Sequence, residues 1–241
     1  MSKIYEALRK AEQDRERVRP RLTPPPPRST DGGRDLQLVQ EEYQKLRASL
    51  VTVAVPSGLH TILITAPRHG EGTTTVAIGL ASALAKERES RVLLVEGNLR
   101  TPALAAILSL PTTTGFTDFA AGRVASEALP IRLDDLNFSV VTAGEPSGAA
   151  VDIDVIDGVL SSLHAQYDFI VVDGPPVNSY ADTSVLSTKV DGVILVIEAD
   201  QTPVSEADVA KRQLEKVGAR ILGVVLNRRR SYLPAFLESV L

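Results

Sequence analysis

Short runs of Val, Ile and Leu alternate with amphipathic helical segments from Asp35 to near the end of the chain. Each run is continuous rather than interrupted by polar residues, which is typical of strands buried on both faces of a parallel sheet. We expect strands at 61–66, 92–96, 138–142, 169–173, 193–198 and 221–226, and helices near 36–54, 73–88, 102–109, 153–165, 180–188 and 204–217. The pattern predicts a doubly wound, mostly parallel α/β fold that binds ligands at the carboxyl ends of its strands.

Two further segments precede this domain, which we place at residues 35–241. Residues 1–19 have the pattern of a short, charged helix with Ile4, Tyr5 and Leu8 on one side. Residues 20–34 contain four consecutive prolines and are expected to form an extended linker. The helix is either a solvated tail or a docking peptide for another protein. The docking peptide is considered because apolar residues on a tethered helix gain little stability unless something covers them.

The composition argues against several classes of function. A net charge of −4, an aromatic content of 4% and the absence of Trp argue against nucleic-acid binding. The absence of Cys excludes disulfides and thiolate metal sites, and it suits the cytosol. Residues 48–67 carry no charge over 20 residues, but Pro56 and Gly58 in their middle indicate a helix end, a turn and a strand. We therefore expect a soluble chain without a membrane span, so that any role at a membrane requires a partner.

A phosphate-binding loop is indicated by ITAPRHGEGTTTVAIGLA at residues 64–81. A strand, a glycine-containing turn and a helix together direct backbone N–H groups and a helix N-terminus at an anion. Against the pattern G-x-x-x-x-G-K-[ST], Pro67 takes the first glycine position, Gly72 the second, Thr73 the lysine position and Thr74 that of the Mg²⁺-binding hydroxyl. The candidate residues for binding ATP or ADP are Arg68, His69, Gly70, Glu71, Gly72, Thr73, Thr74 and Thr75. A glycine turn at this point can also be purely structural.

Two other predicted strands end in acidic residues. FIVVDGPP ends its apolar run at Asp173, where a carboxylate would hold Mg²⁺ together with Thr74. RVLLVEGNLRTP ends its run at Glu96, with Asn98 and Arg100 close behind. A single acidic residue at a strand end often only caps a turn. Three such features at the same edge of one sheet favour a nucleotide site.

Together these segments resemble the bacterial tyrosine kinases, which belong to the MinD/ParA-like class of P-loop NTPases. The loop segment, VLLVEGNLRTP and FIVVDGPP are similar to the Walker A, Walker A′ and Walker B motifs of that family. Two more segments resemble the family. They are DGVILVIEADQT (191–202) and LGVVLNRRR (222–230), and the second resembles the family's last strand with its "LN" ending. EEYQKLRASL (41–50) resembles the helix through which these kinases assemble into rings, and MSKIYEALRKAE (1–12) resembles the start of kinases encoded with exopolysaccharide export systems.

The resemblance implies a CpsD/CapB-like protein-tyrosine kinase that uses ATP and Mg²⁺. It implies catalytic roles for Glu96, Asp173 and Arg100, and contacts between subunits of a homo-oligomer for Glu41 and Arg47. It also implies a cytoplasmic protein that reaches the inner face of the plasma membrane through a membrane-embedded polysaccharide co-polymerase.

Several positions depart from the family pattern. The family has Lys at position 73 and Asp at positions 96 and 98, where this chain has Thr73, Glu96 and Asn98. Gln44 replaces the first arginine of the assembly pattern E-x-x-R-x-x-R, and Tyr232 is the only tyrosine left in the tail as a phosphorylation candidate. These departures fall in functional elements while the predicted strands stay regular, which suggests lost or altered catalysis.

Three functions follow from this pattern. The first is a degenerate kinase-like regulator that binds nucleotide weakly and acts on the co-polymerase. The second is an active ATP-dependent tyrosine autokinase with a modified site, in which Glu96 keeps a carboxylate available as a base. The third is a MinD/ParA-type positioning ATPase, although that group carries a lysine near the start of its loop where this chain has Arg68.

Overall fold

The computed structural model describes residues 32–86, 90–110, 114–145 and 153–229. The chain divides into two compact units, Met1–Val39 and Gln40–Leu241, and the second contains the whole sheet. The helix predicted at 1–19, most of the 20–34 linker and Tyr232 lie outside the described residues.

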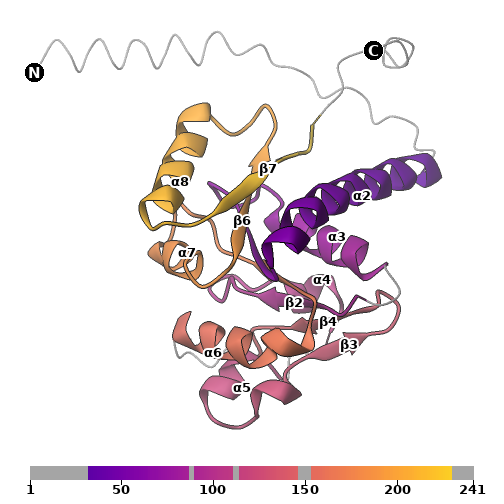
Figure 1. Cartoon of the computed structure of the whole chain (residues 1–241), viewed down its shortest axis with the longest axis vertical. Helices are drawn as coiled ribbons and strands as arrows, with labels where there is room; N and C mark the ends of the chain where they lie inside the picture. The colour runs from indigo at the N-terminus through magenta and orange to yellow at the C-terminus, as the bar shows by residue number, and fades with distance from the viewer. Residues whose placement is uncertain (1–31, 87–89, 111–113, 146–152, 230–241) are drawn as a thin grey trace, which may run out of the picture. The chain divides into compact units, whose positions relative to one another are not determined.

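Among the described residues, seven strands form one sheet in the order β3-β4-β2-β5-β1-β6-β7 (Figure 1). The strands are β1 Thr61–Thr65, β2 Val92–Glu96, β3 Ile131–Leu133, β4 Phe138–Val141, β5 Phe169–Asp173, β6 Gly192–Glu198 and β7 Ile221–Asn227. Neighbouring strands are parallel except for β3 and β4, which are antiparallel. The predicted doubly wound, mostly parallel α/β fold is confirmed.

Helices cover both faces of this sheet. They are α2 Gly32–Ser57, α3 Thr73–Ala85, α4 Leu104–Ile107, α5 Phe116–Ala120, α6 Ile153–Leu163, α7 Ala181–Leu186 and α8 Val204–Lys216, with 3-10 turns η1 Ser126–Ala128 and η2 His164–Gln166. One apolar cluster joins α2, α3 and α4 to the sheet, and a second joins α5, α6, α7 and α8 to the opposite face. The predicted continuous apolar strands therefore bury side chains on both sides.

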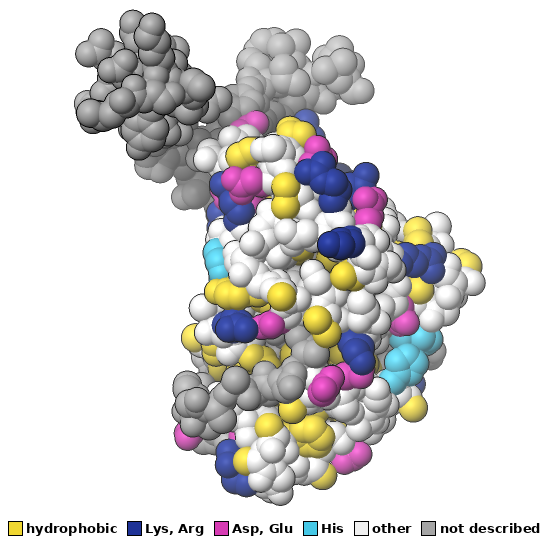
Figure 2. Space-filling view, turned by 90° about the vertical axis from the view of Figure 1, so that its left-hand side faces the viewer, with side chains coloured by type: hydrophobic (Ala, Val, Ile, Leu, Met, Phe, Trp, Pro, Cys, Tyr) yellow, Lys and Arg dark blue, Asp and Glu magenta, His cyan; other side chains and the backbone are white. Residues whose placement is uncertain are grey.

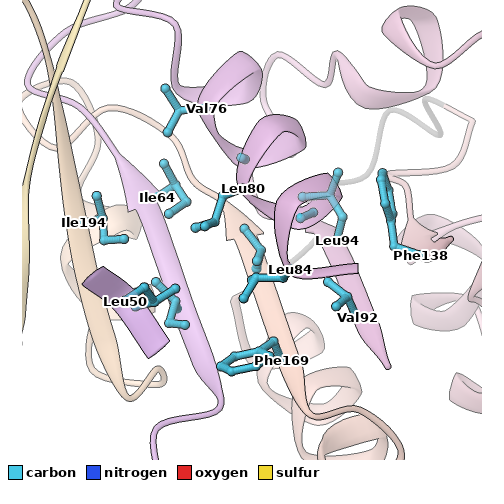
Figure 3. Packing of buried hydrophobic residues seen from close by; sticks show 14 of the residues in the cluster. Leu50, Ile64, Val76, Leu80, Leu84, Val92, Leu94, Phe138, Phe169 and Ile194 are labelled. Carbon is cyan, nitrogen blue, oxygen red and sulfur yellow. The ribbon is translucent and has the colours of Figure 1, made fainter. Parts of the chain in front are cut away.

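The strand and helix that carry the phosphate-binding loop are anchored in the first cluster. In β1, Ile62 and Ile64 belong to this cluster, whereas Leu63 belongs to the second. Figure 3 shows Leu80 and Leu84 of α3 among the side chains of the central strands. Because all five side chains are fully buried or nearly so, the loop between β1 and α3 has two rigid ends.

The observed elements differ from the predicted ones in three places. The helix expected at about 36–54 begins at Gly32 and ends at Ser57, where Gly58 adopts a left-handed conformation with φ 62°. The helix expected near 102–109 covers only Leu104–Ile107. The segment from α5 to β3 was not predicted, because its elements are only three to five residues long and carry little periodicity.

None of the described helices, α2 included, is both long and apolar enough to cross a membrane. The uncharged stretch at 48–67 is the end of α2, a turn and β1, as predicted. Figure 2 shows basic and acidic side chains interspersed over the face that it draws, with apolar groups scattered between them.

Candidate nucleotide site

The loop between β1 and α3 has the backbone of an anion cradle. Gly70 and Gly72 adopt left-handed conformations with φ of 85° and 90°, which glycine reaches without steric cost. Gly72 is the N-cap of α3, and its carbonyl accepts the N–H of Val76 at 3.0 Å. The N–H groups of Thr73 and Thr74 in the first turn therefore have no earlier carbonyl of the helix as acceptor, and the helix dipole favours an anion there.

Asp173 and Thr74 meet beside this cradle. Asp173 ends β5 and is 2% exposed, and Thr74 lies in the first turn of α3. Burial raises the pKa of Asp173 to about 7, with a further increase from Glu96, while a hydrogen bond from the Thr74 side chain lowers it. A cation bound here would favour the charged carboxylate. A hydroxyl and a carboxylate are protein ligands that Mg²⁺ uses alongside substrate phosphates, so these residues fit that metal.

Glu96 is a buried acceptor of backbone N–H groups. One of its carboxylate oxygens accepts the N–H groups of Ala103 and Leu104, the latter at 2.9 Å, and the other accepts the N–H of Ala143 at 3.2 Å. The side chain is 1% exposed. Both oxygens are therefore engaged in holding the start of α4 and the end of β4. Sequence reasoning placed Glu96 correctly at the strand end but did not anticipate these three contacts.

Asn98 stays in a local turn of the loop after β2. Its side-chain amide donates to the Thr101 hydroxyl at 2.9 Å, and its side-chain oxygen accepts the N–H of Thr101 at 3.3 Å. Such a side-chain turn is the usual use of Asn in a loop.

Arg100 is held by a carboxylate in the first turn of α7, the helix that follows β5. Its guanidinium lies 2.6 Å from Oδ2 of Asp182. It also lies 5.0 Å from the centre of the Tyr180 ring, within the range of a cation–π contact. The Tyr180 hydroxyl in turn lies 3.2 Å from Nε2 of His69. The structure thus brings the predicted residues His69 and Arg100 together through a tyrosine that sequence reasoning missed.

Arg68 is held on the other side of the loop. Its guanidinium donates to Glu71 at 3.2 Å and to the carbonyl of Gln201 at 3.0 Å, and it pairs with Glu206 at 3.2 Å. Glu71 is 1% exposed, and the same carboxylate oxygen accepts the Thr202 hydroxyl at 2.9 Å. Arg68 and Glu71 therefore connect the loop to the segment between β6 and α8.

The end of β7 contacts the backbone of the same loop. The Asn227 side-chain amide donates to the carbonyl of Glu71 at 2.8 Å, and Arg228 donates to the carbonyl of Gly70 at 2.9 Å. Arg228 also pairs with Glu198 at 3.1 Å. A side chain at Gly72 would collide with Asn227, so glycine is required there for packing as well as for its φ. Sequence reasoning noted the "LN" pattern here but assigned these residues no role.

The assembly candidates lie on α2 and not at the phosphate-binding loop. Glu41 is exposed, and Arg47 donates to the Gln44 side chain of its own helix at 3.3 Å. Tyr43 connects α2 to the site, because its hydroxyl donates to the carbonyl of Thr75 at 3.2 Å. A side chain at Gly79 would collide with the Tyr43 ring, so glycine allows this close approach. Sequence reasoning missed Tyr43.

Comparisons with known proteins identify the family of this chain. No family model matches the chain. Among curated proteins, it is 30% identical over 177 residues to tyrosine-protein kinase CpsD of Streptococcus pneumoniae, a match that covers 70% of this chain and 76% of CpsD. It is 28% identical over 196 residues to the putative tyrosine-protein kinase CapB of Staphylococcus aureus, covering 79% of this chain and 84% of CapB.

Solved structures show the same relationship. The chimerical protein CapA2B2 superposes with a TM-score of 0.71 at 28% identity, covering 79% of this chain and 85% of that one. The kinase domain of VpsO superposes with a TM-score of 0.70 at 28% identity, covering 81% of this chain and 98% of that domain. MinD of Aquifex aeolicus, at 24% identity and a TM-score of 0.60 over 71% of this chain and 70% of MinD, shares the P-loop NTPase fold. The chain belongs to the bacterial tyrosine-kinase family, in its CpsD/CapB-like group.

Proposed function

We propose that this chain is a catalytically weakened bacterial tyrosine kinase that binds magnesium nucleotides and regulates the polymerisation and export of an exopolysaccharide or capsule. In this proposal it acts by binding a membrane-embedded co-polymerase. Membership of the family supports the general role, and the chemistry of the loop supports the weakened catalysis.

The observation that carries this proposal is that the loop lacks its lysine and that the arginines beside it are paired with carboxylates. Thr73 brings no charge to the β- and γ-phosphates, where the P-loop lysine normally acts. The two arginines that would substitute are both engaged, Arg68 by Glu71 and Glu206 and Arg100 by Asp182. Phosphoryl transfer depends mainly on positioning and charge neutralisation, so the transition state lacks a major source of stabilisation.

Binding of a nucleotide requires fewer positive charges at the site than transfer of its phosphate does. The N–H groups from Gly70 to Thr74 and the N-terminus of α3 would hold the phosphates, and Thr74 and Asp173 would hold Mg²⁺. When bound, Mg²⁺ supplies charge that neutralises the β- and γ-phosphate oxygens. We therefore propose weak binding of MgADP and MgATP.

An active autokinase is the alternative, and the intact Thr74 and Asp173 pair favours it. In that case Glu96 is poorly placed to be the base, because its side chain is 1% exposed and both of its oxygens accept backbone N–H groups. The second alternative, a MinD/ParA-type positioning ATPase, is supported only by the shared fold.

The test is transfer of radiolabel from γ-labelled ATP by the purified full-length chain, with Asp173→Asn as the matched control. Our proposal expects nucleotide binding by calorimetry and little or no labelling of tyrosine. Robust labelling that disappears in Asp173→Asn would instead establish the active kinase.

A further inference from the structure

Tyr180, in the loop after β5, joins the phosphate-binding loop to the loop after β2. Its hydroxyl bonds His69 at 3.2 Å, and the two rings meet edge to face with their centroids 5.4 Å apart. Arg100 lies against the tyrosine ring at 5.0 Å, and Asp182 holds the guanidinium. His69, Arg100 and Tyr180 come from the loops after β1, β2 and β5, which are neighbours in the order β2-β5-β1, and Asp182 lies in the first turn of α7.

The contact between His69 and Tyr180 joins the phosphate-binding loop to the segment that follows the magnesium candidate Asp173. The N-terminus of α3 would hold the phosphates nearer the base, and Mg²⁺ held by Thr74 and Asp173 would neutralise the β- and γ-phosphates. The magnesium candidates Thr74 and Asp173 therefore mark the direction of the γ-phosphate. Tyr180 follows Asp173 along the same loop, whereas the opposite flank of the phosphate-binding loop is occupied by residues 227–228.

A γ-phosphate arriving at this position meets an unfavourable environment. The hydroxyl and the imidazole already bond each other, and the cation of the cluster, Arg100, already pairs with Asp182. A diphosphate ends before this position and leaves all of these contacts in place.

We propose that His69 and Tyr180 determine which nucleotide the site holds, because their hydrogen bond closes the γ-phosphate position. MgADP binds with the pair intact, whereas MgATP must break it. The inference rests on the proposed nucleotide binding and adds the preference for a diphosphate to it. One neutral hydrogen bond corresponds to a change of about two- to tenfold in affinity.

Calorimetry on the full chain tests the preference, with MgADP and the magnesium complex of a non-hydrolysable ATP analogue as probes. Tyr180→Phe keeps the ring and its contact with Arg100 but removes the hydroxyl. It should tighten binding of the triphosphate about two- to tenfold and leave MgADP unchanged. Combining it with His69→Ala should add nothing further, because both variants remove the same contact. Tyr167→Phe, away from the loop, is the matched control.

A second readout needs no nucleotide. The chain has three histidines, so their imidazole signals can be resolved by NMR. Tyr180→Phe should move the His69 signals and leave those of His60 and His164 in place. If neither nucleotide binds the unmodified chain at millimolar concentration, the proposed function fails and the inference fails with it. If both bind but Tyr180→Phe leaves their affinity ratio unchanged, or weakens the triphosphate, only the inference is overturned.

Discussion

Replacing Thr73 with lysine restores a charge where the backbone already points at phosphate. Thr73 is the first residue of α3, directly after the left-handed Gly72. A charge-assisted contact from a lysine to phosphate contributes about 1.5–3 kcal/mol, which corresponds to roughly 10- to 150-fold in affinity. We expect Thr73→Lys to tighten MgATP by an amount in this range, and MgADP by less, because the lysine reaches the β- and γ-phosphates.

Affinity alone should not restore transfer. Arg68 and Arg100 remain paired with carboxylates, and Asn98 remains bonded to Thr101 in its turn. We therefore expect tyrosine labelling to return only when Thr73→Lys is combined with Asn98→Asp, because tighter ground-state binding does not by itself lower the barrier.

Calorimetry measures the affinities, and transfer of radiolabel measures the turnover. The matched control is Thr188→Lys, which adds the same charge at an exposed position outside the phosphate-binding loop. Equal gains from the two lysine variants would show a general charge effect and refute the reasoning about position 73. Full turnover by Thr73→Lys alone would show that Asn98 does not limit catalysis.

Four further outcomes are expected. The pKa of Asp173 is raised from 3.8 to about 7, so the folded state favours the protonated carboxyl. The stability that this protonated side chain contributes is fully present below pH ~4 and is lost as the pH rises through 7. Asp173→Asn should remove that decline. At pH 8 its free energy of unfolding in urea should exceed that of the unmodified chain by at most about 4 kcal/mol. Equal dependence of the two unfolding free energies on pH would contradict this. Glu96→Gln should destabilise the domain by about 1–3 kcal/mol, because its amide group faces backbone N–H donors, and an unchanged melting temperature would exclude the structural role. With Gln44 in place of an arginine, light scattering at micromolar concentration should find a weak ring or none; a stable ring unaffected by Arg47→Ala would oppose this. Deleting residues 1–19 should leave the melting temperature of the domain unchanged and abolish co-purification with the membrane partner, whereas a large loss of stability would mean that this segment packs on the core.

The sheet could be predicted from the sequence because each strand carries its own signal. The apolar runs of β1, β2 and β5 are continuous because these strands are buried on both faces of the sheet. The segment containing α5 and β3 could not, because its elements are only three to five residues long and carry little periodicity.

The loop itself was also predictable, but the state of its side chains was not. The spacing of Gly72, Thr74 and Asp173 predicts where phosphate and metal would bind. Arg68 and Glu71 pair with each other, but their other partners lie more than a hundred residues away, at Gln201 and beyond. Such contacts follow from the order of β1, β6 and β7 in the sheet, which no local pattern encodes.

The contact of Tyr43 with α3 has a thermodynamic consequence. Its hydroxyl bonds the carbonyl of Thr75, one residue after the metal candidate Thr74, and its ring rests where Gly79 leaves room. Any ligand that shifts the first turn of α3 therefore also acts on α2, the helix that resembles the assembly surface of the family. Linkage makes this coupling reciprocal: the factor by which self-association alters nucleotide affinity is the factor by which nucleotide alters self-association. Titrating one equilibrium would thus report the other, even in a chain that transfers no phosphate.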